Sequence, residues 1–366
     1  MLLTSCSTLV KSTPVPPQFT SAAPVRLVRV DYSDLANSRS QVGELEDHLR
    51  QVGVNMVSLG AGRVDWTYFP WRGHSDSWAD AVRTTGVDYL KEDAQRFGKW
   101  SQVSAVIDVL APLYIKAHPE AAAVSWSGQA SQNLVGLMEL VEGPFGKQLL
   151  SMIDYIAVNY AVNSITLSEL VYYVDGFGEK DKAAFLAYSK LADWPQTADG
   201  KIDLDDPAIG KWRAYEIGRF VGQAATVAHK SNKQLFLEVH INLDDAGKVW
   251  LQNGTDYDEL LKSADKLVVW GNYNMEGRAL GAIVNVAYYL TRFEPERVIL
   301  TIGLWDKNYS SDTPKEDMSA IPAEDLRTAL SAADQGEIKN LGVIPSFLLG
   351  DEHWQVLQAM WGPKTP

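Results

Sequence analysis

The chain has 366 residues, of which 46% are hydrophobic and 22% charged, a globular composition with enough apolar material for one large core. Its formal charge of −13 provides no basic surface to neutralise phosphates, which argues against a nucleic-acid partner. Cys6 is the only cysteine, so an intrachain disulfide and a cysteine-based metal site are both excluded.

The first residues resemble the end of a bacterial lipoprotein signal. Small and apolar residues precede Cys6, which would become the lipidated N-terminus, although the basic region and most of the apolar region of a complete signal are missing. The alternative is an accidental cysteine in a disordered tail. Residues 7–24 are rich in Ser, Thr and Pro and predict an extended tether.

We therefore expect residues 1–24 to be a signal remnant and tether, and residues 25–366 to be a single catalytic domain. No apolar run reaches membrane-spanning length, so contact with a membrane would depend on lipidated Cys6. This arrangement predicts a monomer in the bacterial cell envelope, either lipid-anchored or secreted.

Eight short apolar runs of strand character alternate with helix-length segments over the rest of the chain, which predicts an α/β fold, a single (β/α)8 TIM barrel. The runs are 25–32, 55–62, 103–110, 164–169, 235–242, 267–274, 298–305 and 341–347. Helical patterns stand out at 44–52, 152–162 and 211–229. Long βα loops are expected after strands two and four, at Arg63–Arg72 and Tyr172–Pro207, where they would shape a substrate groove.

Polar side chains share one face of several predicted strands. On the first strand, Arg29 and Asp31 alternate with Val28 and Val30. A buried charge costs several kcal/mol unless it is paired, so an interior that carries such groups is expected to be functional. Strands five and six show the same alternation, with these residues on one face: Glu238, His240, Asn242, Trp270, Asn272 and Asn274.

Strand four ends at Glu169, for which we predict the role of general acid. Pairs of carboxylates across a barrel mouth perform glycoside hydrolysis, one as the acid and the other as nucleophile or base. The alternative is a surface glutamate in a salt bridge at the rim. Strand alternation gives Glu169 the parity of apolar Ile165 and Leu167, so it turns inward only beyond the last paired residue or after a bulge.

Three residues compete as the second carboxylate. Glu238 is either the catalytic partner of Glu169 or a structural residue that Arg29 neutralises inside the barrel. Asp31 and Asp108 follow strands one and three, and Asp108 ranks lower because its neighbours on the same face are apolar. The predicted catalytic residues are Glu169, Glu238 and Asp31.

Aromatic rings and amides at strands six and seven suit a polyhydroxylated ligand. Trp270 is either part of this surface or a residue that fills the barrel. The predicted substrate-binding residues are Arg29, Asp108, His240, Asn242, Trp270, Asn272, Asn274, Trp305 and Asp306.

Several other chemistries lack their motifs. The six histidines form no His-Glu-x-x-His or other close ligand pair, so we expect no metal, and no cofactor-binding glycine motif or nucleophile elbow occurs. The segment Asp199–Asp206 resembles a calcium loop, but its spacing differs from an EF-hand and favours a solvated acidic turn.

A family resemblance rests on several segments of the first half of the barrel. Leu49–Val57, followed after the second strand by Tyr68–Arg72, resembles the opening of bacterial glycoside-hydrolase-like barrels, in particular the hydrolase domains that act on poly-N-acetylglucosamine and related exopolysaccharides. Val30–Tyr32 is similar to their first-strand aspartate segment, and His118–Glu120 recurs in them. At strand four those domains carry aspartates where this chain has Glu169.

The resemblance implies hydrolysis of an envelope or extracellular polysaccharide without a cofactor. The alternative function is a catalytically inactive barrel that binds glycan or peptide as an envelope scaffold. A carboxylate separation of about 5–5.5 Å would indicate a retaining enzyme and about 6.5–9.5 Å an inverting one. The sequence leaves that separation, the sugar and the linkage open.

Overall fold

The computed structural model describes residues 23–36, 39–244, 253–309 and 313–363. Cys6 and nearly all of the predicted tether lie outside these residues, so the lipidation site stays a prediction. Within the described residues, no helix has the length and apolar character needed to cross a membrane.

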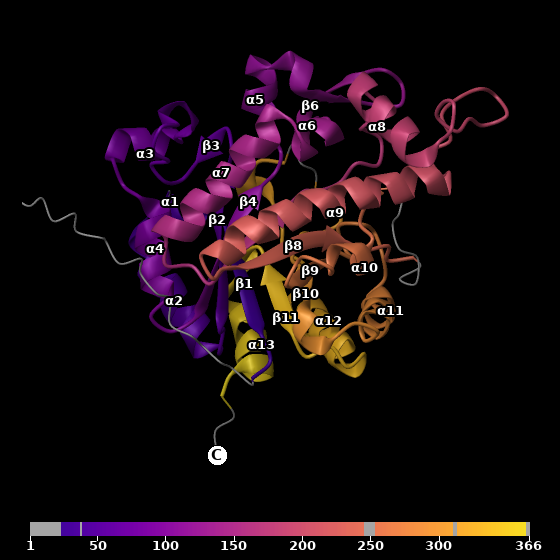
Figure 1. Cartoon of the computed structure of the whole chain (residues 1–366). Coiled ribbons are helices and arrows are strands. Elements are labelled where there is room, and N and C mark those ends of the chain that lie inside the picture. Colours follow the sequence, from indigo (N-terminus) through magenta and orange to yellow (C-terminus); the bar gives the residue numbers. More distant parts are fainter. Residues whose placement is uncertain (1–22, 37–38, 245–252, 310–312, 364–366) are drawn as a thin grey trace, which may run out of the picture.

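Eight parallel strands close into a barrel (Figure 1). Each of the eight predicted strands is present, and β1 pairs with both β2 and β11, which confirms closure by the eighth strand. The barrel strands are β1 (Arg26–Val30), β2 (Met56–Arg63), β4 (Gln102–Asp108), β7 (Ser164–Ser168), β8 (Gln234–His240), β9 (Lys266–Gly271), β10 (Val298–Gly303) and β11 (Leu341–Ile344).

Helices surround the barrel and cover the outward faces of its strands. Two of them begin at aspartates that cap free backbone N–H groups: Asp88 accepts from Lys91 N before α4, and Asp206 accepts from Ala208 N before α9. The helices of the outer layer are α2 (Val42–Gln51), α4 (Tyr89–Phe97), α7 (Pro144–Asn159), α9 (Pro207–Lys230), α11 (Gly281–Leu290), α12 (Ala323–Gln335) and α13 (Asp351–Trp361).

The longer excursions follow β2, β4 and β7, and Figure 1 shows α3, α5, β6 and α8 together at its upper end. The segment after β4 was not anticipated from the sequence and contains a two-stranded sheet of β5 and β6. The segment after β7 contains the helix α8. The remaining elements are α1 (Tyr32–Ala36), β3 (Trp66–Thr67), α3 (Asp80–Thr85), α5 (Pro112–Ala117), β5 (Ala122–Val124), β6 (Ala130–Val135), α6 (Leu137–Val141), α8 (Glu179–Ser189) and α10 (Tyr257–Leu260).

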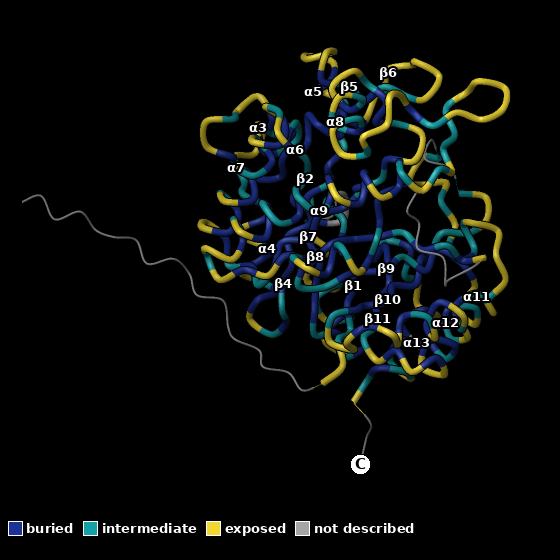
Figure 2. Tube along the Cα trace, turned by 45° about the vertical axis from the view of Figure 1, so that its right-hand side comes forward, coloured by how far each residue is buried: buried dark blue, intermediate teal, exposed yellow. Residues whose placement is uncertain are grey.

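The interior of the barrel changes from apolar to polar along the strands. Figure 2 shows these strands as a buried centre within more exposed loops. Near the strand starts, five apolar side chains form one buried cluster: Leu27, Met56, Phe236, Val268 and Ile299. Two residues further along β1 and β8, alternation brings Arg29 and Glu238 to the same interior. Ser104 and Thr166 contribute only small hydroxyl groups there, bonded to each other at 2.6 Å, which leaves room for the longer charged side chains.

Candidate active site

Arg29 lies at the centre of a buried charge cluster. Its Nη1 atom is 2.6 Å from Oε2 of Glu238, and its Nε atom is 3.2 Å from Oδ1 of Asp31. The Glu238 side chain is 3% exposed and the Asp31 side chain 29% exposed. Burial disfavours the charged guanidinium, but the neighbouring carboxylates outweigh it and raise the pKa of Arg29 above its ordinary value. Glu238 is therefore neutralised within the barrel, whereas Asp31 is held by the same guanidinium and reaches solvent.

Asp108 lies between this cluster and β7. It is the last residue of β4 and lies beside Ser168 in the β4–β7 register. Its Oδ1 atom accepts a hydrogen bond of 2.9 Å from Leu110 N. Burial raises the pKa of Asp108, while the Leu110 bond, Arg63 and Arg29 oppose the rise.

Glu169 follows the last residue of β7 and has a backbone φ of +67°. This left-handed conformation is unfavourable for a residue with a Cβ atom and is concentrated at functional sites in proteins. Val171 N donates a 3.0 Å hydrogen bond to Glu169 O and closes a tight turn. Glu169 therefore lies beyond the last paired residue of the strand, which is the position that an inward orientation requires.

The electrostatic surroundings of Glu169 are those of the barrel interior. Burial raises the pKa of its carboxyl to about 7, and the negative charges of Asp108 and Glu238 add to the rise while Arg29 opposes it. A carboxyl with a pKa raised to this range can hold a proton near neutral pH and donate it.

A second group of predicted residues forms a wall of rings and amides at β8 and β9. The rings of His240 and Trp270 lie 4.6 Å apart between centroids with an interplanar angle of 53°. Burial lowers the pKa of His240 to about 4, so this imidazole is neutral at pH 7. Asn272 is 5% exposed and its amide lies against Gly303, where a Cβ atom would collide with it.

Three of the predicted binding residues take part in turns at the rim. Asn242 Oδ1 accepts from Asp244 N at 3.0 Å, and Asp306 Oδ1 accepts from Asn308 N at 2.7 Å. The backbone carbonyl of Asn274 accepts from Gly277 N at 2.8 Å. These hydrogen bonds stabilise the loops, and none of them connects to the Arg29 cluster.

Sequence reasoning missed two residues of the mouth. Tyr309 lies on the loop after β10, and its ring is 5.5 Å from that of Trp305. Burial raises the pKa of Tyr309, with smaller contributions from Glu169 and Asp31, so its hydroxyl is within electrostatic reach of both carboxylates. Arg63 ends β2 and acts on Asp108. Searching every strand end for charged residues would have found Arg63, whereas Tyr309 has no such signal.

The candidate site consists of acidic side chains in the barrel interior and of aromatic rings beside them. In the part of the chain that the structure describes, no group of three or more His, Cys, Asp or Glu side chains is placed to hold a metal ion. Proton transfer by carboxylates is the chemistry that these side chains can perform by themselves.

No protein-family model matches the sequence, and neither does any curated protein. Solved structures match over nearly the whole chain. The glycoside hydrolase domain of PgaB (BpsB) from Bordetella bronchiseptica has 17% identity and a TM-score of 0.69, covering 93% of this chain and 100% of that one. The catalytic domain of β-amylase from Paenibacillus polymyxa has 12% identity and a TM-score of 0.62, covering 94% and 100%.

The C-terminal domain of a putative chitinase from Desulfitobacterium hafniense has 12% identity and a TM-score of 0.55, covering 93% of this chain and 99% of that one. Identities this low show the shared fold and leave residue roles open. The chain has the (β/α)8 barrel fold of glycoside hydrolases.

Proposed function

We propose that the protein is a glycoside hydrolase that cleaves an envelope or extracellular polysaccharide, with Glu169 as its general acid. The observation that carries the proposal is the position of Glu169 directly after β7, beyond the last paired residue, where burial and the neighbouring Asp108 and Glu238 raise its pKa to about 7. Cleavage of a glycosidic bond needs a proton on the leaving oxygen, and an acid is most effective when its pKa lies near the working pH.

We assign the second catalytic role to Asp31 in preference to Glu238. Glu238 is buried and bound to Arg29 at 2.6 Å, so its role is to fix the guanidinium and to keep negative charge near Glu169. Asp31 is held 3.2 Å from the same guanidinium but is 29% exposed, so water reaches it. In the proposed reaction Asp31 takes a proton from a water molecule while the oxygen of that water attacks the anomeric carbon. Glu169 gives its proton to the departing glycosidic oxygen.

The aromatic rings of the site support a saccharide as the substrate. Trp270, Trp305 and Tyr309 offer flat faces on which the C–H face of a sugar ring packs. The likeness to hydrolase domains of PgaB, chitinase and β-amylase supports the same substrate class.

The envelope location is part of the same proposal. Lipidation of Cys6 would keep the barrel beside the polysaccharide. Labelling the cells with an alkyne fatty acid should mark the protein expressed from its own gene, and Cys6→Ser should remove the label. Equal labelling of the Cys6→Ser protein would contradict the anchor.

The deciding experiment is reducing-end release from purified polysaccharides, including poly-N-acetylglucosamine, chitin and biofilm extracts. On a substrate that the parent cleaves, Glu169→Gln should lower the rate by about 10²–10⁴-fold, because the amide cannot deliver a proton. Glu337→Gln is the matched control, since Glu337 is an exposed glutamate with a φ of +68° and should keep full activity. Binding without release on every substrate would favour the inactive scaffold instead.

A further inference from the structure

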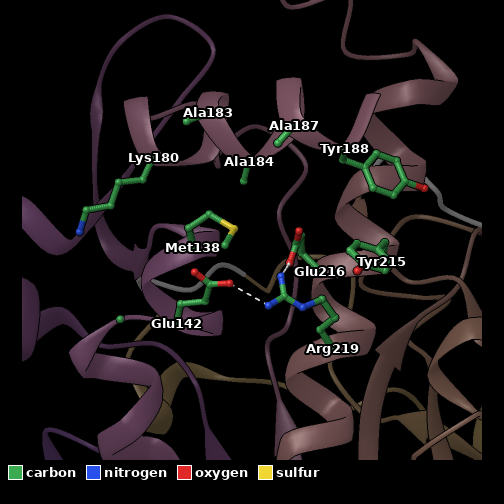
Figure 3. Close-up of a pocket in the computed structure, with 11 residues that line it drawn as sticks. Met138, Glu142, Lys180, Ala183, Ala184, Ala187, Tyr188, Tyr215, Glu216 and Arg219 are labelled. Atoms are coloured by element: carbon green, nitrogen blue, oxygen red, sulfur yellow. Dashed lines mark hydrogen bonds and ion pairs between the residues drawn. The ribbon is translucent and has the colours of Figure 1, made fainter. Parts of the chain in front are cut away.

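A cleft of about 690 Å³ lies between α8 and the neighbouring helices α6 and α9 (Figure 3). Its residues come from the excursions after β4 and β7 and from the helix that leads to β8, and none of them belongs to the predicted site. The volume is in the range of about 300–1,000 Å³ that is usual for small-molecule sites.

Two exposed tyrosines stand at one end of this cleft. Tyr188 on α8 is 41% exposed and Tyr215 on α9 is 45% exposed. Their ring centroids are 5.1 Å apart at an interplanar angle of 31°, and Figure 3 shows the two rings next to each other. Large rings left in solvent on two different helices form a surface on which a flat apolar ligand face can stack.

The charged groups of the cleft are held in ion pairs. Arg219 donates to Glu142 at 2.7 Å and to Glu216 at 2.5 Å. Lys180 Nζ lies 3.4 Å from Oε2 of Glu139. An anionic or cationic ligand would have to compete with these ion pairs. A neutral ligand with hydroxyl groups would not, because each carboxylate and guanidinium keeps further hydrogen-bonding positions.

The cleft also has small and apolar lining residues. Ala183, Ala184 and Ala187 line it from α8, and Met138 lies on the α6 side (Figure 3). Their small side chains leave space for a ring, and the thioether is a polarisable contact for C–H groups. Apolar ring faces and a periphery of hydroxyl groups are the two properties of a pyranose unit.

We propose that this cleft is a second carbohydrate-binding site, which takes a neutral oligosaccharide segment of a polysaccharide. The inference goes beyond the proposed function, since the cleft can bind a glycan whether or not the barrel hydrolyses it. The cleft is firmly attached to the barrel mouth. Arg213, two residues before Tyr215, is fully buried and donates to the carbonyls of Tyr173 and Asp175 in the loop that follows Glu169.

The test is affinity electrophoresis in native gels that contain a neutral polysaccharide, with separate gels for glycol chitin, hydroxyethyl cellulose, pullulan and galactomannan. At least one of these gels should retard the parent protein. Tyr188→Ala/Tyr215→Ala should weaken that retardation at least 5-fold, because both stacking faces are removed. Ala187→Arg should weaken it as well, since the longer side chain occupies the cleft while both rings remain.

Tyr288→Ala is the matched control, because Tyr288 is a 76% exposed tyrosine on α11, outside the cleft, and its loss should leave retardation unchanged. The thermal midpoint of each variant shows whether it is folded. Equal retardation of the parent and the double variant would overturn the proposal, and so would free migration of the parent in all four gels.

A parallel assay separates this proposal from the proposed function. Glu169→Gln should keep tyrosine-dependent retardation while losing turnover. If the parent hydrolyses nothing but the tyrosine-dependent retardation persists, the second site stands and the hydrolase assignment fails. If turnover occurs without such retardation, the reverse holds.

Discussion

Arg29 on the first barrel strand and Glu238 on the fifth form an ion pair of 2.6 Å, although they lie 209 positions apart in the chain. The Glu238 side chain is 3% exposed, so its charge has almost no water to stabilise it and depends on the guanidinium. The same guanidinium also holds Asp31. This one residue therefore links the stability of the barrel to the position of the proposed base.

Removing Arg29 should strongly destabilise the protein. Arg29→Met leaves Glu238 as a buried charge without its partner, and we expect a loss of about 3–5 kcal/mol in the free energy of unfolding, measured by urea denaturation at pH 7. Arg327→Met is the control, because its pair with Glu324 is exposed and should contribute less than about 1 kcal/mol.

Adding Glu238→Gln to Arg29→Met should recover part of that loss, since the unpaired charge is then gone. A double-mutant cycle gives the coupling between the two residues. A coupling below about 0.5 kcal/mol would show that the pair is not what holds the interior together.

Tyr309 should contribute to substrate binding through its ring. Tyr309→Ala removes the face that lies beside Trp305, and kcat/KM should fall about 10-fold, mainly through a higher KM. Tyr309→Phe keeps the ring and should stay near the parent value. Equal losses in both variants would mean that the hydroxyl matters more than the ring, which steady-state kinetics on one soluble substrate would reveal.

The strands and their order were predictable because hydrophobic alternation and fixed chain direction determine them. The structure has the eight strands where the sequence predicts them. The interior position of Arg29 and Glu238 followed from the alternation of side chains along the strands alone. The pairing between these two residues was one of the two alternatives that the sequence left open, and only the geometry distinguishes them.

The loops and turns were less predictable because their conformations depend on tertiary contacts. Parity directs Glu169 away from the interior, and a φ of +67° changes that direction, which no periodic pattern encodes. Asn242 and Asp306, which stay predicted substrate-binding residues, each accept a backbone N–H two residues later, a local bond that Asn and Asp commonly make. Tyr309 lies in a loop without periodicity and gave no signal.

Asp108 should shift the alkaline limit of activity through its effect on the pKa of Glu169. In the proposed reaction the protonated form of Glu169 is the active one, so kcat/KM should fall as pH rises through about 7. Asp108→Asn removes a negative charge that raises the pKa of Glu169, so the falling limb should shift to lower pH, measured as the pH dependence of kcat/KM from pH 5 to 9. The asparagine oxygen still accepts the hydrogen bond from Leu110, which preserves the turn. A limb that stays in place or moves to higher pH would remove Asp108 from the surroundings of the acid.

Glu169→Gln should lose activity and gain stability at alkaline pH. The pKa of Glu169 is about 7 in the folded protein and 4.5 in the reference state, so folding takes up a proton between these values. The stability that this residue provides is complete below about pH 4.5 and is lost as pH rises through about 7, where a partly buried carboxylate must form. Glutamine avoids that charge. The free energy of unfolding of the variant should therefore match that of the parent near pH 4.5 and exceed it by about 1–3 kcal/mol at pH 8, measured by urea denaturation.

Glu337→Gln, at an exposed glutamate, should give a difference in the free energy of unfolding that does not change with pH. A Glu169→Gln protein that is no more stable than the parent at pH 8 would show that the carboxyl is solvated, and it would then be unsuited to hold the proton that the proposed reaction requires.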